Sequence, residues 1–423
     1  MTASNVPRIL RPRRAAPADA VRPTRAEVNL EALRHNLRVV RRHADGARVW
    51  AVLKADAYGH GAPAVARTLE RARVDGFCVA LIEEGIELRE AGITAPILVM
   101  GGHYGSAHDE VVARDLTPVV HDAEQVRAFA RLVRSGAASR PVRVHLKVDT
   151  GMGRLGVTMR ELPDVARAIA AQPEVAVEGL MTHLACADGE SPEETLTQLA
   201  RFEEATALLA RHGITPRLRH AANSAALLQL PASPEGSGIA RPPASPEGSG
   251  AARPSRATLD AVRPGLALFG VSPRVAGNAL TSELKPAMRV RTEIVACREV
   301  EEGGTVGYGA TWRAPRRSCI ATVAMGYADG LSRRLSNRGH LLVRGLRAPI
   351  VGAVSMDMTM VDVTDVPGAR VGDDVIVLGE QDARGEGLRA SIGADEIAAH
   401  ADTIAWEVLT SVSRRVPRFY REP

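Results

Sequence analysis

The lysines of this chain stand out because they are so few. Of its 54 lysine and arginine residues only three are lysine, namely Lys54, Lys147 and Lys285. Arginine holds its proton at any accessible pH, whereas a lysine with a lowered pKa can act as a base or form a Schiff base with a carbonyl compound. A surviving lysine is therefore a candidate for chemistry, although a compositional bias would also leave a few by chance. Lys54 is the sharpest case, since it ends the apolar run "WAVLK" and is followed by the turn-forming residues "ADAYGHG".

Further polar side chains stand where other apolar runs end. They are Lys147 and Arg154 in "KVDTGMGRLG", His183 in "LMTHLA", Asn223 with Ser224 in "HAANS", and Arg263 in "VRPG". One such residue alone is more often structural than catalytic. Together they suit a phosphate held by backbone N–H groups and a hydroxyl, at Ser224, Gly265 and Leu266, with a lysine at the aldehyde of the same ligand. The segment "GMGRLG" has neither the Gly-Lys-Ser/Thr of a P-loop nor the glycine spacing of a dinucleotide fold, which argues against a nucleotide site.

The elements that must position these residues alternate between strand and helix. Short β-branched runs between about residues 48 and 270 are separated by amphipathic stretches with apolar residues at helical spacing. Eight strands with helices between them predict an α/β fold, a (β/α)8 TIM barrel, in which catalytic groups gather at the carboxyl ends of the strands. A doubly wound open sheet is the alternative that the pattern leaves open. The eight runs are "RVWAVLK", "GFCVALI", "PILVMG", "LTPVVH", "VRVHLKVDT", "VEGLMTHLA", "LRHAANS" and "ATLDAVRPG".

The pattern of predicted elements changes after Gly270, from alternating strands and helices to mostly strands. Short, glycine-bounded runs such as "SCIATVAMGYADG" and "HLLVRGLRAPIVGAVS" follow with little helix between them, and they predict a β-rich C-terminal domain. We expect the barrel over residues 25–275, the β-rich domain over 276–423 and a disordered tail over 1–24. Residues 233–256 hold a tandem repeat, "SPEGSGIARPPA" and "SPEGSGAARPSR", whose composition predicts a flexible loop without a catalytic role, and a partner-binding loop is the alternative.

Composition narrows the classes of function. With 45% hydrophobic residues and no run long enough to cross a membrane, the chain is expected to be a soluble, cytoplasmic protein without a membrane partner. Its net charge of +5 comes from arginines scattered beside acidic residues, which argues against a nucleic-acid partner. The four cysteines form no CxxC pair, so neither a metal site nor a disulfide framework is expected.

Several motifs resemble those of the alanine racemases. The segment "AVLKADAYGHG" is similar to the pyridoxal-phosphate attachment motif of that family, and the likeness continues in order through "KVDTGMGRLG", "HAANSAA", "RPGLALFG", "VGYGATW", "MGYADG" and "SMDM". The resemblance implies a racemase that depends on pyridoxal 5'-phosphate, interconverts L- and D-alanine and supplies D-alanine for peptidoglycan. It also implies a homodimer with its active sites at the subunit interface.

The resemblance assigns cofactor contacts residue by residue. Lys54 matches the lysine that holds the aldehyde of the cofactor, and Arg263 matches an arginine that faces the pyridine nitrogen, with His183 bridging Arg263 to a catalytic tyrosine. Because arginine does not readily give up a proton, the ring nitrogen would stay largely unprotonated and the cofactor would be a weak electron sink. The phosphate contacts of the family match Tyr58, Ser224, Gly265, Leu266 and Trp406.

Racemisation removes the α-proton of an amino acid from one face and returns it to the other, which is simplest with two bases. By resemblance Lys54 is one base and Tyr308, in "GTVGYGATW", is the other. In the family the second domain presents this tyrosine to the cofactor of the partner subunit. An active monomer is therefore not expected.

Other matches lie around the substrate. Arg154 matches an arginine near the phenolate oxygen of the cofactor and the substrate carboxylate. Lys147 matches a lysine that carries a carbamate in some members and orients that arginine, and an ordinary ion pair is the alternative. The residues that match the substrate pocket and its entrance are Tyr327, Met356 and Asp357.

One position departs from the family. Trp406, in "TIAWEVL", stands where the family usually has a tyrosine that contacts the phosphate and limits the pocket. Indole offers one N–H donor and is larger, so a racemase of broader specificity, acting on serine or other small amino acids, is an alternative. A barrel decarboxylase that uses the same cofactor, or a non-catalytic carrier of it, is a more distant one.

Overall fold

The computed structural model describes residues 21–102, 107–138, 141–189, 193–229, 259–273, 283–382 and 389–422. These residues form two compact units. The barrel unit comprises residues 29–287 and 405–410 with the last residues of the chain, and the β-rich unit comprises the residues up to 28, 288–404 and 411–420. The repeat over 233–256 and most of the tail expected over 1–24 lie outside the described residues.

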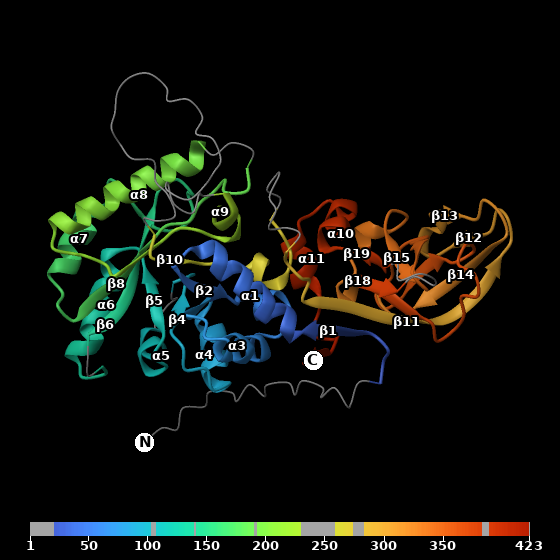
Figure 1. Cartoon of the computed structure of the whole chain (residues 1–423), viewed down its shortest axis with the longest axis horizontal. Helices are drawn as coiled ribbons and strands as arrows, with labels where there is room; N and C mark the ends of the chain where they lie inside the picture. The colour runs from blue at the N-terminus through green and yellow to red at the C-terminus, as the bar shows by residue number, and fades with distance from the viewer. Residues whose placement is uncertain are drawn as a thin grey trace. The chain divides into compact units, whose positions relative to one another are not determined.

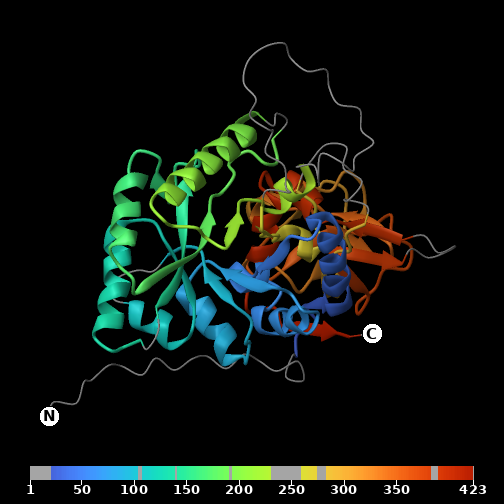
Figure 2. The same ribbon diagram turned by 60° about the vertical axis from the view of Figure 1, so that its left-hand side comes forward.

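Parallel strands with helices outside them form the barrel unit (Figures 1 and 2). The strands lie in the order β10-β2-β3-β4-β5-β6-β8-β9, so neighbours in the chain are neighbours in the sheet. Hydrogen bonds from Asp260 N to Arg219 O (2.9 Å) and from Arg263 N to Ala222 O (2.8 Å) join the two end strands and nearly close the barrel. The predicted (β/α)8 barrel is confirmed. Its strands are β2 Arg48–Val52, β3 Gly76–Val79, β4 Ile97–Val99, β5 Thr117–Val120, β6 Val142–Asp149, β8 Val175–Met181, β9 Leu218–His220 and β10 Ala261–Val262, with the short β7 Val157–Thr158 beside β6.

The helices of the barrel unit have the apolar faces that the sequence pattern predicts. In α1 the side chains of Leu33, Leu37 and Val40 are buried, and the helix begins after Asn29, whose side-chain oxygen accepts from two backbone N–H groups of the first turn. The helices are α1 Leu30–Ala44, α2 Lys54–Tyr58, α3 Ala62–Arg71, α4 Ile82–Glu90, α5 His108–Ala113, α6 Ala123–Arg134, α7 Leu162–Ala170, α8 Glu193–Arg211 and α9 Ser224–Gln229.

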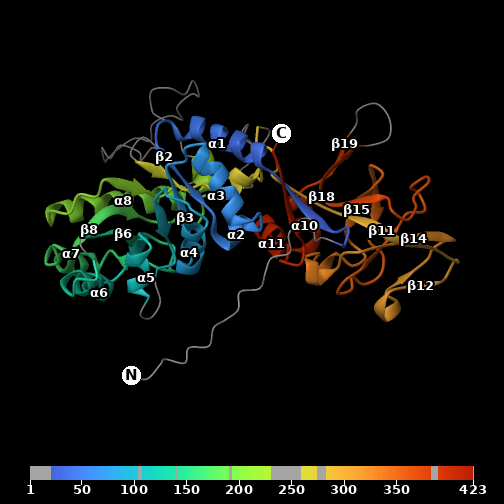
Figure 3. The same cartoon turned by 90° about the horizontal axis from the view of Figure 1, so that it is seen from below.

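Antiparallel pairing organises the β-rich unit (Figure 3). The long strand β11 pairs with β1, β14 and β18, and bulges interrupt its register near Val290 and Ile294. The predicted β-rich second domain is confirmed. Its elements are β1 Arg25–Asn29, β11 Met288–Val300, β12 Thr305–Val306, β13 Trp312–Arg313, β14 Ser318–Val323, β15 His340–Val343, β16 Leu346–Pro349, β17 Thr359–Asp362, β18 Asp374–Asp382, β19 Arg389–Ile392, α10 Ala394–Ala401 and β20 Arg418–Arg421, while α11 Ala405–Ser411 lies mostly in the barrel unit.

The N-terminal residues pack differently from the expected boundaries. Strand β1, whose residues fall within the range expected to form the barrel, pairs antiparallel with β11 of the β-rich unit. Thr24, expected in a disordered tail, shares a hydrogen bond of 2.9 Å with Thr292, and Arg22 donates two hydrogen bonds to the buried carboxylate of Asp329. These partners lie more than 260 residues away in the chain, so a local sequence pattern carries no signal for them.

Candidate active site

Lys54 begins a left-handed turn at the end of β2. The four residues that follow it, from Ala55 to Tyr58, all have φ between 52° and 55°. This conformation costs a residue with a side chain roughly 1–2 kcal/mol, so such a run needs support from its surroundings. Hydrogen bonds from Ala57 N to Leu53 O (2.8 Å) and from Gly59 N to Ala55 O (2.9 Å) close the turn.

Neighbouring elements hold this turn in place. Glu84 of α4 accepts a hydrogen bond from Ala55 N at 2.6 Å, and Asp56 accepts one from Ala62 N at 2.8 Å. A Cβ on Gly59 would lie 2.4 Å from the carbonyl oxygen of Leu409, so only glycine lets α11 approach this closely. The turn is thereby fixed, and the position of Lys54 with it. The sequence did not single out Glu84, although its position at the start of a predicted helix is typical of a capping residue.

Cations gather around Lys54. Partial burial lowers the pKa of Lys54, and repulsion from Arg154 lowers it further against the opposing attraction of Glu84. Lys147 of β6 is only 5% exposed, and burial together with Arg154 and Arg263 lowers its pKa to about 8. A group of cations with this surplus of positive charge suits a ligand that carries phosphate and carboxylate groups.

The segment that carries Arg154 is folded by one carboxylate. Asp149, at the end of β6, accepts hydrogen bonds from the backbone N–H groups of Gly151, Met152 and Gly153 at 2.8–3.2 Å. Burial would raise the pKa of Asp149, but these donors outweigh it and the pKa is lowered. The motif "DTGMGR" is therefore a rigid loop that sets Arg154 at the strand end.

A second cluster fits the phosphate of pyridoxal phosphate. Ser224 Oγ, at the start of α9, accepts from Gly265 N (3.0 Å) and Ala267 N (3.3 Å), which flank the N-terminus of the 3-10 helix Leu266–Phe269. A Cβ on Gly265 would lie 2.3 Å from the Tyr58 hydroxyl, so the absent side chain leaves room beside that hydroxyl. Burial raises the pKa of Tyr58, which keeps the phenol protonated as a donor. Backbone N–H groups and two hydroxyls around a glycine are a suitable donor set for a phosphate.

Arg263 lies 3% exposed at the end of β10. Its guanidinium donates to Thr182 O (2.8 Å), to Ala221 O (3.0 Å) and to His220 Nδ1. The bridge from Arg263 through His183 to the catalytic tyrosine stays a prediction. Burial and the positive charge of Arg263 lower the pKa of His183 to about 3. Sequence reasoning gave His220 no role, although it is the first residue of the quoted "HAANS".

Trp406 lies in the part of α11 that belongs to the barrel unit. Its side chain is half-buried, and the helix that carries it contacts Gly59 directly after the left-handed turn. The C-terminal position of Trp406 therefore packs with the same unit as Lys54 and Tyr58.

The four predicted site residues of the β-rich unit lie on its surface. Tyr308 is 74% exposed and Met356 is 52% exposed. The segments around Tyr327 and Met356 are joined by hydrogen bonds from Tyr327 N to Ser355 O (2.9 Å) and from Ala328 N to Met356 O (3.0 Å). The carboxylate of Asp357 accepts from Arg415 at 2.6 Å.

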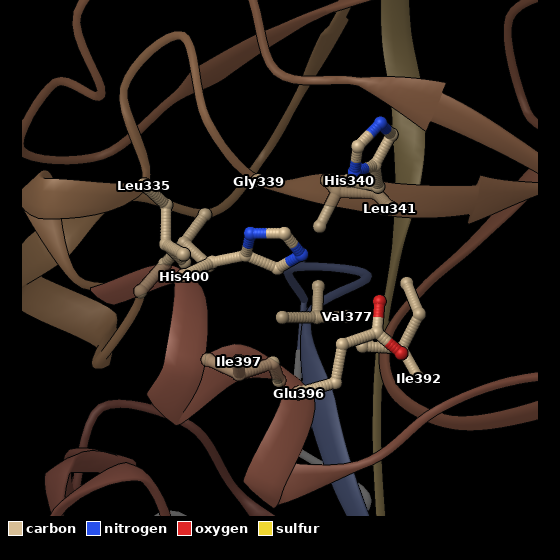
Figure 4. Close-up of a pocket in the computed structure, with 10 residues that line it drawn as sticks. Leu335, Gly339, His340, Leu341, Val377, Ile392, Glu396, Ile397 and His400 are labelled. Carbon is tan, nitrogen blue, oxygen red and sulfur yellow. The ribbon is translucent and has the colours of Figure 1, made fainter. Parts of the chain in front are cut away.

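A pocket elsewhere in the β-rich unit contains none of the predicted site residues (Figure 4). Apolar side chains line it together with His340, His400 and Glu396, and burial and the neighbouring His400 lower the pKa of His340. Among the described residues no three His, Cys, Asp or Glu side chains form a candidate metal site, and no helix is long and apolar enough to cross a membrane.

A barrel with a lysine at its first strand end, donors around Gly265 that suit a phosphate and a β-rich second domain fits a class of two-domain enzymes that bind a phosphorylated aldehyde cofactor. Sequence models of the alanine racemase N-terminal and C-terminal domains match residues 28–242 and 287–420. The chain belongs to the alanine racemase family. The resemblance in its motifs is confirmed, and the chain is a racemase that depends on pyridoxal phosphate.

Individual relatives cover nearly the whole chain. The alanine racemase of Sorangium cellulosum is 59% identical over 95% of this chain and 100% of its own length, and that of Symbiobacterium thermophilum is 42% identical over 95% and 98%. Among solved structures, the alanine racemase of Streptomyces lavendulae has a TM-score of 0.82 at 32% identity, covering 95% of this chain and 98% of its own. The Bartonella henselae enzyme, described with covalently bound pyridoxal phosphate, has a TM-score of 0.79 at 27% identity over 94% and 99%.

Proposed function

We propose that this chain interconverts L- and D-alanine with Lys54 and Tyr308 as its two bases. The observation that carries the proposal is the left-handed turn, which fixes Lys54 at the strand end among cations while its own pKa is lowered. A lysine with a lowered pKa holds a larger neutral fraction near neutral pH, as a base requires. When bound, pyridoxal phosphate withdraws electrons from the α-carbon and makes its hydrogen acidic.

Other candidate residues of the barrel unit bind and orient the cofactor in this proposal. Tyr58, Ser224 and the N–H groups at Gly265 and Leu266 hold the phosphate, with Trp406 nearby. Arg263, donor-only and buried, faces the pyridine nitrogen and does not give that nitrogen a proton.

Two further barrel residues orient the substrate in this proposal. Arg154 binds the substrate carboxylate. Lys147 supports Arg154, and its lowered pKa makes the carbamate form accessible.

We propose further that the enzyme is a homodimer in which Tyr308, Tyr327, Met356 and Asp357 complete the partner's site. The exposure of Tyr308 and Met356 in the single chain supports this, because large apolar side chains gathered on a surface mark interaction sites. A two-fold dimer would bury the same surface of both subunits and build two equal sites.

Mixing two inactive variants tests the shared site. Lys54→Ala and Tyr308→Phe are each expected to be inactive, whereas subunit exchange between them forms heterodimers that contain one intact site. A statistical mixture should recover about a quarter of the wild-type racemisation rate. The control mixes Lys54→Ala with the double variant, which has no intact site in any pairing. No recovery in mixtures shown by mass to contain heterodimers would place both bases in one chain.

A chiral product assay across alanine, serine, arginine and lysine tests the substrate. We expect alanine to be racemised fastest, in keeping with a role in supplying D-alanine for peptidoglycan. A racemase of broader specificity remains the second candidate because of Trp406, and serine turnover as fast as that of alanine would favour it. Loss of CO2 instead of inversion would indicate the decarboxylase alternative. We expect the enzyme in the cytoplasm, which suits its cysteines, all free thiols.

A further inference from the structure

One buried histidine of the barrel has no part in the proposed chemistry. His145 of β6 is 0% exposed, and its ring lies 4.9 Å from that of His220. Its Nδ1 is 2.8 Å from His220 Nε2, and the other nitrogen of His220 bonds Arg263. Arg263, His220 and His145 thus form a continuous chain of hydrogen bonds that runs from the candidate site into the barrel.

Arg263 fixes the direction of the hydrogen bonds that join Arg263, His220 and His145. An arginine side chain only donates hydrogen bonds, so His220 Nδ1 must be an acceptor without a proton. A neutral imidazole carries its proton on the other nitrogen, and His220 Nε2 must therefore donate to His145 Nδ1. His145 in turn must carry its own proton on Nε2.

Neighbouring residues leave a specific space for the His145 ring. The register between β6 and β8 shifts beside His145, so that Val144 lies opposite Val177 and His145 lies opposite Gly179. A Cβ on Gly179 would be 2.5 Å from His145 Nδ1, so a side chain there would displace the ring. The ring of Trp50 packs 5.5 Å from that of His145.

The chain of hydrogen bonds ends at His145. Its Nε2 atom is buried and has no hydrogen-bond partner among the described residues. A buried donor without a partner is destabilising and is uncommon in native proteins. Such a cost is expected where an arrangement is kept for function rather than for stability.

We infer that His145 is a positioning residue. Its Nδ1 accepts a hydrogen bond from the Nε2–H of His220 and so holds His220 in the one tautomer whose Nδ1 can accept from Arg263. The guanidinium is then held by three acceptors in a single orientation toward the site. Burial and the charge of Arg263 lower the pKa of His220 and bring that of His145 to about 3, which agrees with two neutral rings. A charged His220 would instead turn an N–H toward the N–H of Arg263. The effect on catalysis rests on the proposed function, whereas the tautomers do not.

Two substitutions separate positioning from packing. In His145→Asn the side-chain oxygen is bonded to Cγ as Nδ1 is, so an acceptor for His220 remains although the smaller side chain leaves a void. His145→Leu fills more of the space but offers no acceptor. Positioning predicts that Leu lowers kcat about tenfold or more while Asn stays within about threefold, the size of effect seen for groups that orient a site residue. Packing alone predicts the reverse order, because the larger void destabilises more.

Neutron diffraction from crystals of the full chain with its cofactor reads the protons directly. We expect deuterium on Nε2 and none on Nδ1 in both His220 and His145, and the same for His220 in His145→Asn. Deuterium on Nδ1 of His220, or a folded His145→Leu with wild-type kcat, would overturn the inference. If His145→Leu does not fold, the neutron result and the kcat of His145→Asn still decide it. A wild-type protein that does not racemise alanine would refute the proposed function and leave the tautomer result standing.

Discussion

The candidate residues of the two units differ in how they are held. In the barrel unit Arg263, Ser224 and Tyr58 are buried, and neighbouring residues hold Arg263 and Ser224 by hydrogen bonds. In the β-rich unit Tyr308 and Met356 lie on the surface. A group that must keep its geometry against a bound cofactor is fixed within its own chain, whereas a surface that acts on another subunit is completed only on assembly. The difference agrees with the proposal that the barrel binds the cofactor with its own residues and that the β-rich unit would add function in a dimer.

The largest expected effect on racemisation comes from replacing Lys54 of the barrel unit. Lys54→Ala removes the group that holds the cofactor aldehyde and one base, so racemisation should fall by about 10³-fold or more. An absorbance scan should also lose the band of the attached cofactor. Lys285→Ala is the matched control, because Asn36 binds the backbone of Lys285 and not its amine. An equal loss in both variants would contradict a special role for Lys54.

If the barrel holds the cofactor with its own residues, adding one methyl group at Gly265 should weaken the binding of pyridoxal phosphate. In Gly265→Ala the new Cβ would lie 2.3 Å from the Tyr58 hydroxyl, so we expect the Kd for pyridoxal phosphate to rise at least about tenfold, or about 1.4 kcal/mol. Equilibrium binding followed by absorbance measures it. In Gly46→Ala the new Cβ would meet no atom within 4 Å beyond the chain neighbours but would be strained by the φ of 84°, so this variant controls for backbone strain away from the site. An unchanged Kd in Gly265→Ala would move the phosphate away from this cradle.

The strand-end cluster was predictable because it depends on local sequence. Lys54, Lys147 and Arg263 each lie at or near the carboxyl end of a barrel strand, so the alternation of strand and helix sufficed to predict that they come together. His220 was missed because its role depends on which neighbour Arg263 faces, and this is a tertiary contact. The place of β1 was missed for the same reason, since its alternating pattern suits a barrel and a β-rich sheet equally.

For the buried Lys147 of the barrel unit we predict that formation of a carbamate depends on pH. Carbon dioxide reacts with neutral amines, and with a pKa of about 8 the neutral fraction of Lys147 grows steeply between pH 6 and pH 8. At constant dissolved CO2 we therefore expect a carbamate signal in 13C NMR that rises over this range. The signal should be absent from Lys147→Arg, which cannot form it. A wild-type spectrum without the signal at pH 8 would favour the ordinary ion pair.

The smallest expected effect concerns Trp406, which the motif resemblance places where the family usually has a tyrosine. The indole is half-buried on the helix that packs against Gly59, so Trp406→Tyr should restore a hydroxyl near the phosphate without disturbing the turn that carries Lys54. We expect the Kd for pyridoxal phosphate to fall by about two- to fivefold, the size of one modest hydrogen bond, and the ratio of alanine to serine rates to rise. Trp406→Phe removes the donor without adding a hydroxyl and serves as the control. If Tyr and Phe gave the same Kd and the same rate ratio, residue 406 would contact neither the phosphate nor the substrate, and the limit on substrate size would have to come from the exposed residues of the partner's β-rich unit.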